Sequence, residues 1–427
     1  MFFCPCFMTS MTMIPICNAR VYILDRVRDD PRAEQRLDRM LRAIHPDEVT
    51  WIDEGQLARL VIDHAWTNGH QLRTGSYHRA GSPVLIFNTF RWNASEIATL
   101  ANDYPALNSC MLLGQSPVTT RSRFNVRGTE WCVCQEAKEI HSIYGCLHAC
   151  DYCHVEDFAN IMLDLEQLVN HVATVIDETP GQQLYKYDNY TDQLCFEPEY
   201  GASELLVPFF AGKDDKYLLL YTKSDNVDHL LDLDHGGKTI INWSLSPRTQ
   251  SIAIEKGTPP VERRIDAMKR CQDAGYRVRA RLSPIIPVQN WQEEYREMID
   301  GLFDAASPDV ITLDIVGFMT PSQMKVAMDT SLFDARARAL LDEQEASSRT
   351  SWGKHVFPHE YRQELYESII EAIRARNPGQ VISICNETFE MWESMSPALG
   401  ANGNLEKFTC CCGPTSVPGQ HLLGFDT

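Results

Sequence analysis

The stretch Cys146-Leu-His-Ala-Cys150-Asp-Tyr-Cys153 places three thiols within eight residues of the chain. Thiolates are the usual protein ligands of iron–sulfur clusters, and closely spaced cysteines in one loop can bind three irons of the same cluster. Structural zinc sites instead use four ligands in paired spacing, and the sequence holds no second Cys-x-x-Cys pair. The three thiols therefore predict a metal centre whose fourth position is open for a reacting ligand.

Around this stretch, strand-like and helix-like segments alternate along the chain. We expect strands over residues 140–144, 193–197, 216–222, 238–244, 276–285 and 309–315. We expect helices over residues 156–176, 201–211, 226–233, 259–274, 291–305 and 321–328. Such alternation predicts a parallel sheet with crossover helices, and six units fit a partial (β/α)6 TIM-like barrel. Ligands of such barrels bind at the C-terminal ends of the strands, and the cysteine stretch directly follows the first strand.

Three further units surround the predicted barrel, which covers residues 136–330. Residues 1–135 are expected to form an N-terminal α/β unit, with a helix over 31–44 and strands over 20–25, 48–53 and 83–88. Residues 331–395 add a helix over 359–376 and a strand over 381–385 that complete the core. Residues 396–427 form a cysteine-rich tail with many glycines, prolines and asparagines, which we expect to be irregular. The predicted fold class is therefore α/β.

The composition is that of a globular protein with a strong negative charge. The 427 residues include 58 acidic and 39 basic side chains, which gives a formal net charge of −19. An acidic chain repels phosphate backbones unless a local basic groove compensates. The only dense basic segment, residues 248–281, is interpreted as a set of solvated faces. DNA is therefore the less favoured partner.

Hydrophobicity and cysteine content bear on the cellular compartment. No run of 18 apolar residues is present, so a membrane span is not expected. Fifteen cysteines in a large chain without a secretion signal favour metal-binding or catalytic thiols in a reducing cytoplasm. Cys132 and Cys134 are interpreted as buried strand residues rather than ligands.

The spacing of the three cysteines after a first strand, with Tyr152 before the last one, resembles the radical S-adenosylmethionine (SAM) superfamily. Further segments resemble the spore photoproduct lyase group of that superfamily, and the resemblance covers roughly residues 140–385. These segments are Lys223-Ser-Asp-Asn-Val-Asp-His-Leu-Leu231, Glu255-Lys-Gly-Thr-Pro259, Ala274-Gly-Tyr276, Asn290-Trp-Gln-Glu-Glu-Tyr295 and Trp352-Gly-Lys354.

The resemblance implies a cofactor set and residues that bind it. Cys146, Cys150 and Cys153 would hold a 4Fe–4S cluster, whose fourth iron chelates the amino and carboxylate groups of SAM. Positions that contact SAM in the lyase are occupied here by Lys223 and Ser244, with Tyr152 beside them and Ser283 at a small residue near SAM. A cation and a hydroxyl donor suit a carboxylate.

The resemblance also implies the reaction class. A small electron donor such as flavodoxin or ferredoxin would reduce the cluster, and one electron would break a carbon–sulfur bond of SAM. Cys195 occupies the position of the cysteine that returns a hydrogen atom to the product radical in the lyase. The residues that follow it, 196–201, diverge from the lyase, and a buried strand cysteine is the alternative interpretation.

Several features depart from the DNA-repair members. His154 replaces a tyrosine, and the tail carries Cys410, Cys411 and Cys412, with Cys385 shortly before it. Soft thiolates favour soft centres, and trivalent arsenic takes three thiolates. We expect the tail to fold over the barrel mouth and bind a substrate. A solvent-exposed tail and a second cluster site are the alternatives.

These departures lead to a preferred function and two competitors. A cysteine-rich radical SAM protein of this shape is similar to the enzyme of arsinothricin biosynthesis, which moves the 3-amino-3-carboxypropyl group of SAM onto arsenite. We therefore expect a small thiophilic substrate such as arsenite. Repair of a thymine photoproduct in DNA is the alternative enzyme function. A non-catalytic iron–sulfur protein is disfavoured because Lys223 and Ser244 are retained.

Overall fold

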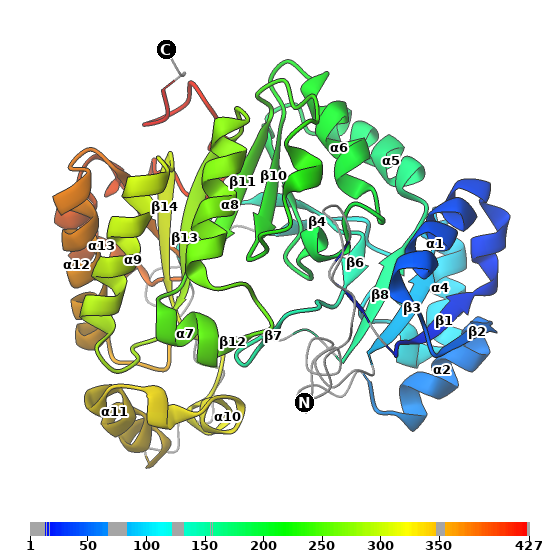
Figure 1. Cartoon of the computed structure of the whole chain (residues 1–427), viewed down its shortest axis with the longest axis horizontal. Coiled ribbons are helices and arrows are strands. Elements are labelled where there is room, and N and C mark those ends of the chain that lie inside the picture. Colours follow the sequence, from blue (N-terminus) through cyan, green and yellow to red (C-terminus); the bar gives the residue numbers. More distant parts are fainter. Residues whose placement is uncertain are drawn as a thin grey trace.

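The computed structural model describes residues 13, 15–16, 18–66, 83–121, 132–153, 155, 157–346 and 355–424. Two sheets lie side by side, an N-terminal sheet and a larger one that carries most of the helices (Figure 1). His154 and the segment Trp352-Gly-Lys354 lie outside the described residues. None of the described helices combines the length and the low polarity that crossing a bilayer requires.

The N-terminal sheet has five strands in the order β2-β1-β3-β8-β6, and only β6 runs antiparallel to its neighbour. Its strands are β1 Arg20–Leu24, β2 Glu48–Ile52, β3 Val84–Asn88, β6 Ile143–Tyr144 and β8 Phe158–Met162. The prediction of a helix from residue 156 is wrong at its start, because β8 precedes the helix α5, Leu165–Glu178. All five β8 residues are buried and pair with β3, so sheet pairing decides the structure of this short apolar run. The N-terminal sheet therefore includes two strands, β6 and β8, that lie outside the predicted N-terminal unit of residues 1–135.

Helices cover both faces of this sheet. The predicted helix over 31–44 is confirmed as α1, Pro31–Ile44, and Asp30 caps its N-terminus. Residues of α1 share a core with Val21 and Ile23 of β1, whereas Leu24 of β1 packs with α2 on the other face. This division follows from the alternation of side chains along a strand. The remaining helices of this region are α2 Glu54–Asp63 and α4 Ala94–Asp103.

The larger sheet has eight strands in the order β15-β14-β13-β11-β10-β9-β5-β4. All are parallel except β4, and no pairing joins β15 to β4 among the described strands, so the sheet is an open, partial barrel. The predicted α/β fold class is confirmed. The strands are β4 Val118–Arg121, β5 Ala137–Ile140, β9 Leu184–Tyr187, β10 Tyr217–Thr222, β11 Thr239–Ser244, β13 Arg277–Ile285, β14 Val310–Ile315 and β15 Val381–Ile384.

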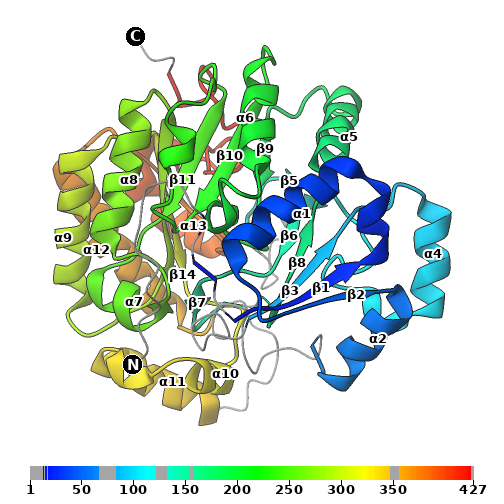
Figure 2. The same cartoon turned by 45° about the vertical axis from the view of Figure 1, so that its right-hand side comes forward.

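Helices cover the outer face of this sheet, with α8, α9 and α12 side by side along one edge (Figure 2). The helices that follow β9 along the chain are α6 Ala202–Ala211, α7 Arg248–Ala253, α8 Val261–Asp273, α9 Trp291–Ala305, α10 Pro321–Ala327, α11 Ala335–Ala346, α12 His359–Arg376 and α13 Phe389–Leu399, and of these α10 and α11 lie below the sheet in Figure 1. The expected helix over 226–233 is a single 3-10 turn, Asp228–Leu230.

The second barrel strand differs from the prediction. The expected strand over 193–197 is wrong, because Gln193–Phe196 is a short 3-10 helix and the strand is β9, Leu184–Tyr187. The strand β9 was missed because the charged Lys186 interrupts its run of buried apolar and aromatic residues. The Lys186 ammonium is buried and lies 2.9 Å from the Glu139 carboxylate of the adjacent β5, which allows a lysine in the sheet interior.

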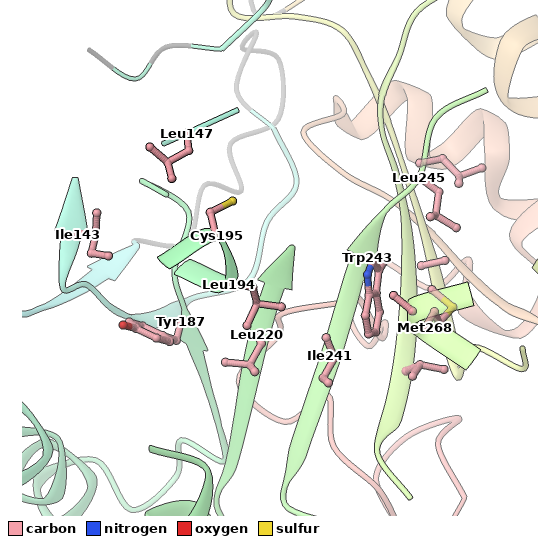
Figure 3. Packing of buried hydrophobic residues seen from close by; sticks show 14 of the residues in the cluster. Ile143, Leu147, Tyr187, Leu194, Cys195, Leu220, Ile241, Trp243, Leu245 and Met268 are labelled. Atoms are coloured by element: carbon pink, nitrogen blue, oxygen red, sulfur yellow. The ribbon is translucent and has the colours of Figure 1, made fainter. Parts of the chain in front are cut away.

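The two faces of the barrel strands have different partners. Leu220, Ile241 and Trp243 belong to the main core on the outer face, where Met268 of α8 lies beside them (Figure 3). Residues of the inner face, such as Leu219 and Tyr221, pack instead against the tail cysteines and Val417. The tail is therefore part of the core of the barrel.

The tail approaches the sheet from the N-terminal ends of the strands. The carbonyl of Pro414 accepts hydrogen bonds from the backbone at the start of β9, and buried Arg279 donates to the carbonyls of Cys411 and Ser416. The red tail accordingly lies at the end of the sheet opposite to β7 and β12 (Figure 1). The prediction that the tail folds over the barrel mouth is wrong. The buried Arg279 guanidinium needs hydrogen-bond acceptors, and the tail carbonyls of Cys411 and Ser416 supply them inside the barrel.

Candidate functional site

A cavity of about 200 Å³ opens at the C-terminal ends of β10 and β11. Most of the predicted site residues lie together around it. Its lining includes the predicted residues Cys146, Cys150, Tyr152, Cys153, Lys223 and Ser244. Ser283, Cys195 and the three tail cysteines are not among the lining residues.

Local backbone geometry fixes the cysteine loop at the cavity. Gly145 has φ +111°, and a Cβ there would lie 2.2 Å from the Phe158 carbonyl oxygen, so only glycine fits before Cys146. The two-residue strand β7, Ala149–Cys150, pairs antiparallel with β12, Glu255–Lys256. The Lys256 ammonium also lies 2.7 Å from the Asp151 carboxylate. The loop is therefore held at both of its ends.

Glu255 is the centre of a buried polar network behind the cavity. Its carboxylate accepts hydrogen bonds from Tyr152 at 2.5 Å and from Arg264 at 2.7 Å, and it lies 3.4 Å from the Lys223 ammonium. Burial alone would raise the pKa of Glu255, but Lys223 and Arg264 lower it to about 2. The carboxylate is therefore ionised and holds Lys223 at the cavity wall.

Asp192 organises a second network beside the first. Its carboxylate accepts hydrogen bonds from the Thr222 hydroxyl at 2.8 Å and from the backbone nitrogen of Lys223 at 2.7 Å. His148 Nε2 lies 3.2 Å from the same carboxylate. Sequence analysis missed both Glu255 and Asp192. Glu255 lies in a segment that carried the resemblance, whereas no local pattern marks Asp192.

Cys195 lies behind the cavity wall. It is fully buried on the short helix Gln193–Phe196, close to Leu147 of the cysteine loop (Figure 3). Its Sγ lies 3.3 Å from His148 Nε2. Burial raises the pKa of the Cys195 thiol, and a hydrogen bond from it lowers the pKa of Cys146 to about 7. The role of Cys195 as a hydrogen donor stays a prediction.

Ser283 contacts the site residue Lys223 through its backbone carbonyl. Its carbonyl accepts a hydrogen bond from the Lys223 ammonium at 3.2 Å, while its hydroxyl donates to Asp314 at 2.8 Å. The hydroxyl is thus occupied within the protein. Ser283 therefore positions Lys223, and direct contact of its side chain with SAM stays a prediction.

The donor set of the cavity fits an iron–sulfur cluster with a polar ligand. Three thiols converge from one loop, in the ligand type that such clusters require. Among the residues that the structure describes, the side-chain atoms Asp188 Oδ2, Thr191 Oγ1 and Arg281 Nε are buried without a hydrogen-bond partner. All three residues line the cavity. Buried polar atoms usually have partners, so these suit a ligand with amino, carboxylate or hydroxyl groups.

The inner wall of the cavity is shared with the tail. Tyr221 and Arg281 line the cavity, and each also contacts a cysteine on its other side. The Tyr221 hydroxyl lies 3.0 Å from Cys411 Sγ, and Arg281 Nη2 lies 3.6 Å from Cys385 Sγ. The structure therefore places the predicted substrate cysteines behind this wall. Their role as a substrate site stays a prediction.

Comparisons with known proteins give a consistent result. The family model described as spore photoproduct lyase matches residues 137–384. The spore photoproduct lyase of Bacillus subtilis is 25% identical over 240 residues, which cover 54% of this chain and 70% of the relative. The relative from Geobacillus is 22% identical over 242 residues, with coverage of 54% and 70%.

Solved structures agree in fold. A structure titled "Spore photoproduct lyase complexed with dinucleoside spore photoproduct" aligns with a TM-score of 0.61 at 17% identity, covering 86% of this chain and 98% of that one. The structure of a mutant spore photoproduct lyase gives a TM-score of 0.61 at 17% identity, with coverage of 88% and 99%. The family match spans more than half of the chain, which therefore belongs to the spore photoproduct lyase family of radical SAM enzymes, with a 4Fe–4S cluster and S-adenosylmethionine as cofactors.

Proposed function

We propose that Cys146, Cys150 and Cys153 hold the 4Fe–4S cluster and that Lys223 and Ser244 bind SAM beside it. The observation that carries this proposal is that all five residues line one cavity. When bound, the cluster supplies one electron for reductive cleavage of a carbon–sulfur bond of SAM. A one-electron donor such as flavodoxin or ferredoxin would reduce it.

The protein's own residues bind and orient the ligand. Lys223 is fixed by the Glu255 carboxylate, by the Ser283 carbonyl and, through its backbone, by Asp192. Its ammonium is thus aligned for a carboxylate, which prefers a charge-assisted donor. The ammonium also lies 5.9 Å above the Tyr152 ring, and Ser244 adds a hydroxyl on the neighbouring strand. A fixed polar wall of this kind replaces water around the ligand.

We further propose that the substrate is small and thiophilic, and that the reaction is transfer of the 3-amino-3-carboxypropyl group of SAM to arsenite. The support is the wall formed by Tyr221 and Arg281, which separates the cavity from Cys411 and Cys385 by one layer of side chains. In such a transfer a carbon–sulfur bond breaks and a carbon–arsenic bond forms. Arsenic is oxidised from the trivalent to the pentavalent state while the sulfonium becomes a thioether, so the initiating electron is recovered.

Repair of a thymine photoproduct in DNA is the second candidate function. The observation in its favour is the family itself, because the relatives are named spore photoproduct lyase and one solved relative is titled as a complex with dinucleoside spore photoproduct. In this case Cys195 would supply the returning hydrogen atom. Cys195→Ala would then abolish repaired product while 5′-deoxyadenosine continues to form.

One experiment separates the two functions. The cluster is reconstituted anaerobically and the enzyme is supplied with dithionite and SAM, with arsenite or with photoproduct-bearing DNA. 5′-Methylthioadenosine together with an organoarsenic product supports transfer, and 5′-deoxyadenosine with repaired thymines supports the lyase. Cys150→Ser, which lacks one cluster ligand, controls for background cleavage. Absence of any SAM cleavage would contradict both functions.

We propose that residues 136–330 form the radical SAM unit and that residues 331–395 complete its core. The support is that β15 from the second segment pairs with β14 from the first. Residues 396–427 are then the cysteine-rich tail and residues 1–135 the N-terminal unit, whose sheet borrows β6 and β8.

A further inference from the structure

Two residues of the cavity wall hold Cys195 in place. Cys195 is 0% exposed and does not itself line the cavity, whereas His148 and Asp192 do. His148 Nε2 lies 3.3 Å from Cys195 Sγ, and the carbonyl of Asp192 accepts a hydrogen bond from the Cys195 backbone nitrogen at 3.1 Å. His148 and Asp192 therefore fix the side chain and the backbone of Cys195 just behind the space that a ligand would occupy.

The His148 ring is fixed in turn. Its Nδ1 lies 3.1 Å from the Gly257 carbonyl oxygen, and its Nε2 lies 3.2 Å from the Asp192 carboxylate as well as near Cys195. The Thr222 hydroxyl donates to the same carboxylate at 2.8 Å. His148 is only 5% exposed, so packing also restricts its ring. A side chain that is locked by packing and hydrogen bonds in this way holds the group that it contacts in one geometry.

The same two residues contact both parts of the proposed cofactor site. The backbone nitrogen of His148 donates to Cys146 Sγ at 3.4 Å, and the Asp192 carboxylate accepts a hydrogen bond from the backbone nitrogen of Lys223 at 2.7 Å. His148 thus joins Cys195 to a proposed cluster ligand, and Asp192 joins it to the lysine proposed to bind SAM. Rates depend on such placement, because a displacement of about 1 Å can cost about a hundredfold.

We propose that His148 and Asp192 are positioning residues for Cys195, which hold its sulfur atom beside the cluster loop for the return of a hydrogen atom. The inference rests on the proposed repair function for the use of that hydrogen atom. The placement of the thiol is a property of the folded chain and holds whichever substrate is bound. A cysteine that only fills a core behaves as a small apolar side chain, and its thiol would not depend on His148.

Infrared spectroscopy of the Cys195 thiol tests the placement without any substrate. The S–H stretching band of Cys195 is isolated as the difference between cluster-loaded proteins with and without the substitution Cys195→Ala. We expect this band to shift in His148→Leu, which removes both ring nitrogens, and to return toward its wild-type position in His148→Gln, which restores a polar group. His171→Leu is the matched control and should leave the band unchanged, because His171 is half-buried on α5 and outside the cavity.

An unchanged band in His148→Leu would overturn the positioning role. If His148→Leu takes up less iron than the wild type, Asp192→Asn decides instead, because it removes the carboxylate that His148 contacts and nearly keeps the size of the side chain. An unchanged band there counts equally against the role. A bound metal ion is the competing explanation, since His148, Asp192 and Cys195 offer one ligand atom each within 4.8 Å of one another. Stoichiometric zinc in the wild type that is lost in Cys195→Ala would overturn the proposal in favour of a metal site.

Product analysis with photoproduct-bearing DNA separates the positioning role from the repair function. We expect the yield of repaired thymines per 5′-deoxyadenosine to fall about tenfold or more in His148→Leu and to recover partly in His148→Gln, because a displaced thiol donates its hydrogen more slowly. An equal yield in the wild type and in His148→Leu would contradict the role of His148. A band shift in His148→Leu, from a wild type that repairs no thymine, would instead support the placement of Cys195 and contradict the repair function.

Discussion

The Lys223 ammonium lies 3.4 Å from the Glu255 carboxylate, and Arg264 lies 2.7 Å from the other oxygen of the same group. Two cations thus share one buried anion, so these three side chains together carry one net positive charge. Lys223 carries this charge toward the ligand, because Arg264 is fully buried whereas Lys223 lines the cavity. A carboxylate is the group that such a wall attracts.

Replacing Lys223 with methionine is therefore expected to weaken SAM binding while the cluster is retained. Loss of one charge-assisted hydrogen bond corresponds to about tenfold or more in affinity. Glu255 keeps Arg264 as its partner, so the fold should persist. Equilibrium dialysis of labelled SAM against cluster-loaded protein measures the change, and Lys269→Met on the surface of α8 is the control. Unchanged SAM affinity would remove Lys223 from the binding site.

Much of the fold follows from local patterns in the sequence. The bounds of α1, α9 and α12 agree with the prediction, because their apolar residues repeat at helical spacing over three turns or more. The errors have specific physical causes. β9 was missed because a buried ion pair places Lys186 within it, and β8 was missed because a short apolar run does not distinguish strand from helix.

The site was predictable only where the resemblance to the lyase family assigns a role to a residue. The cysteine loop, Lys223 and Ser244 were found in this way, and the structure brings them to one cavity. Asp192 was not, because its function arises from contacts with Thr222 and His148 that lie thirty or more residues away. The contact between Tyr221 and Cys411 spans 190 positions, so no local pattern could reveal it.

Gly145→Ala is expected to impair loading of the cluster. The substituted Cβ would approach the Phe158 carbonyl oxygen to 2.2 Å at a φ of +111°, so the loop before Cys146 must shift. We expect iron and sulfide content after reconstitution to fall at least twofold. Gly181→Ala is the matched control, because nothing lies within 4 Å of a Cβ at that position. Normal iron content in Gly145→Ala would show that the loop position is not critical.

Arg279→Met is expected to destabilise the protein and release the tail. The substitution removes the partner of Asp309 at 2.8 Å, which leaves that carboxylate only Arg277 at 4.0 Å, and it removes the donor to the carbonyls of Cys411 and Ser416. Breaking a buried ion pair in this way costs about 3 kcal/mol or more of the free energy of unfolding. Urea denaturation measures the loss, and limited proteolysis should cleave the tail first. Arg336→Met, which removes an exposed ion pair with Glu364, should cost less than about 1 kcal/mol. Equal stability of the two variants would contradict the anchoring role.

His229 is expected to make stability fall on acidification. Burial lowers the pKa of His229 to about 4, and both of its ring nitrogens are buried without hydrogen-bond partners among the described residues. An unfolded histidine has a pKa of about 6.5, so between these values the unfolded chain binds more protons than the folded one. The free energy of unfolding should therefore fall as the pH is lowered from about 6.5 to 4, by at most about 1.4 kcal/mol per pH unit from this group.

The comparison of variants isolates this contribution from other acid-sensitive groups, including the cluster. His229→Gln cannot titrate, so the difference in unfolding free energy between it and the wild type should shrink or change sign as the pH falls through that window. His64→Gln, at an exposed position, is the control variant. If the difference in unfolding free energy between His229→Gln and the wild type did not change with pH, His229 would have the same pKa in the folded and the unfolded chain. Burial would then not lower the pKa of His229.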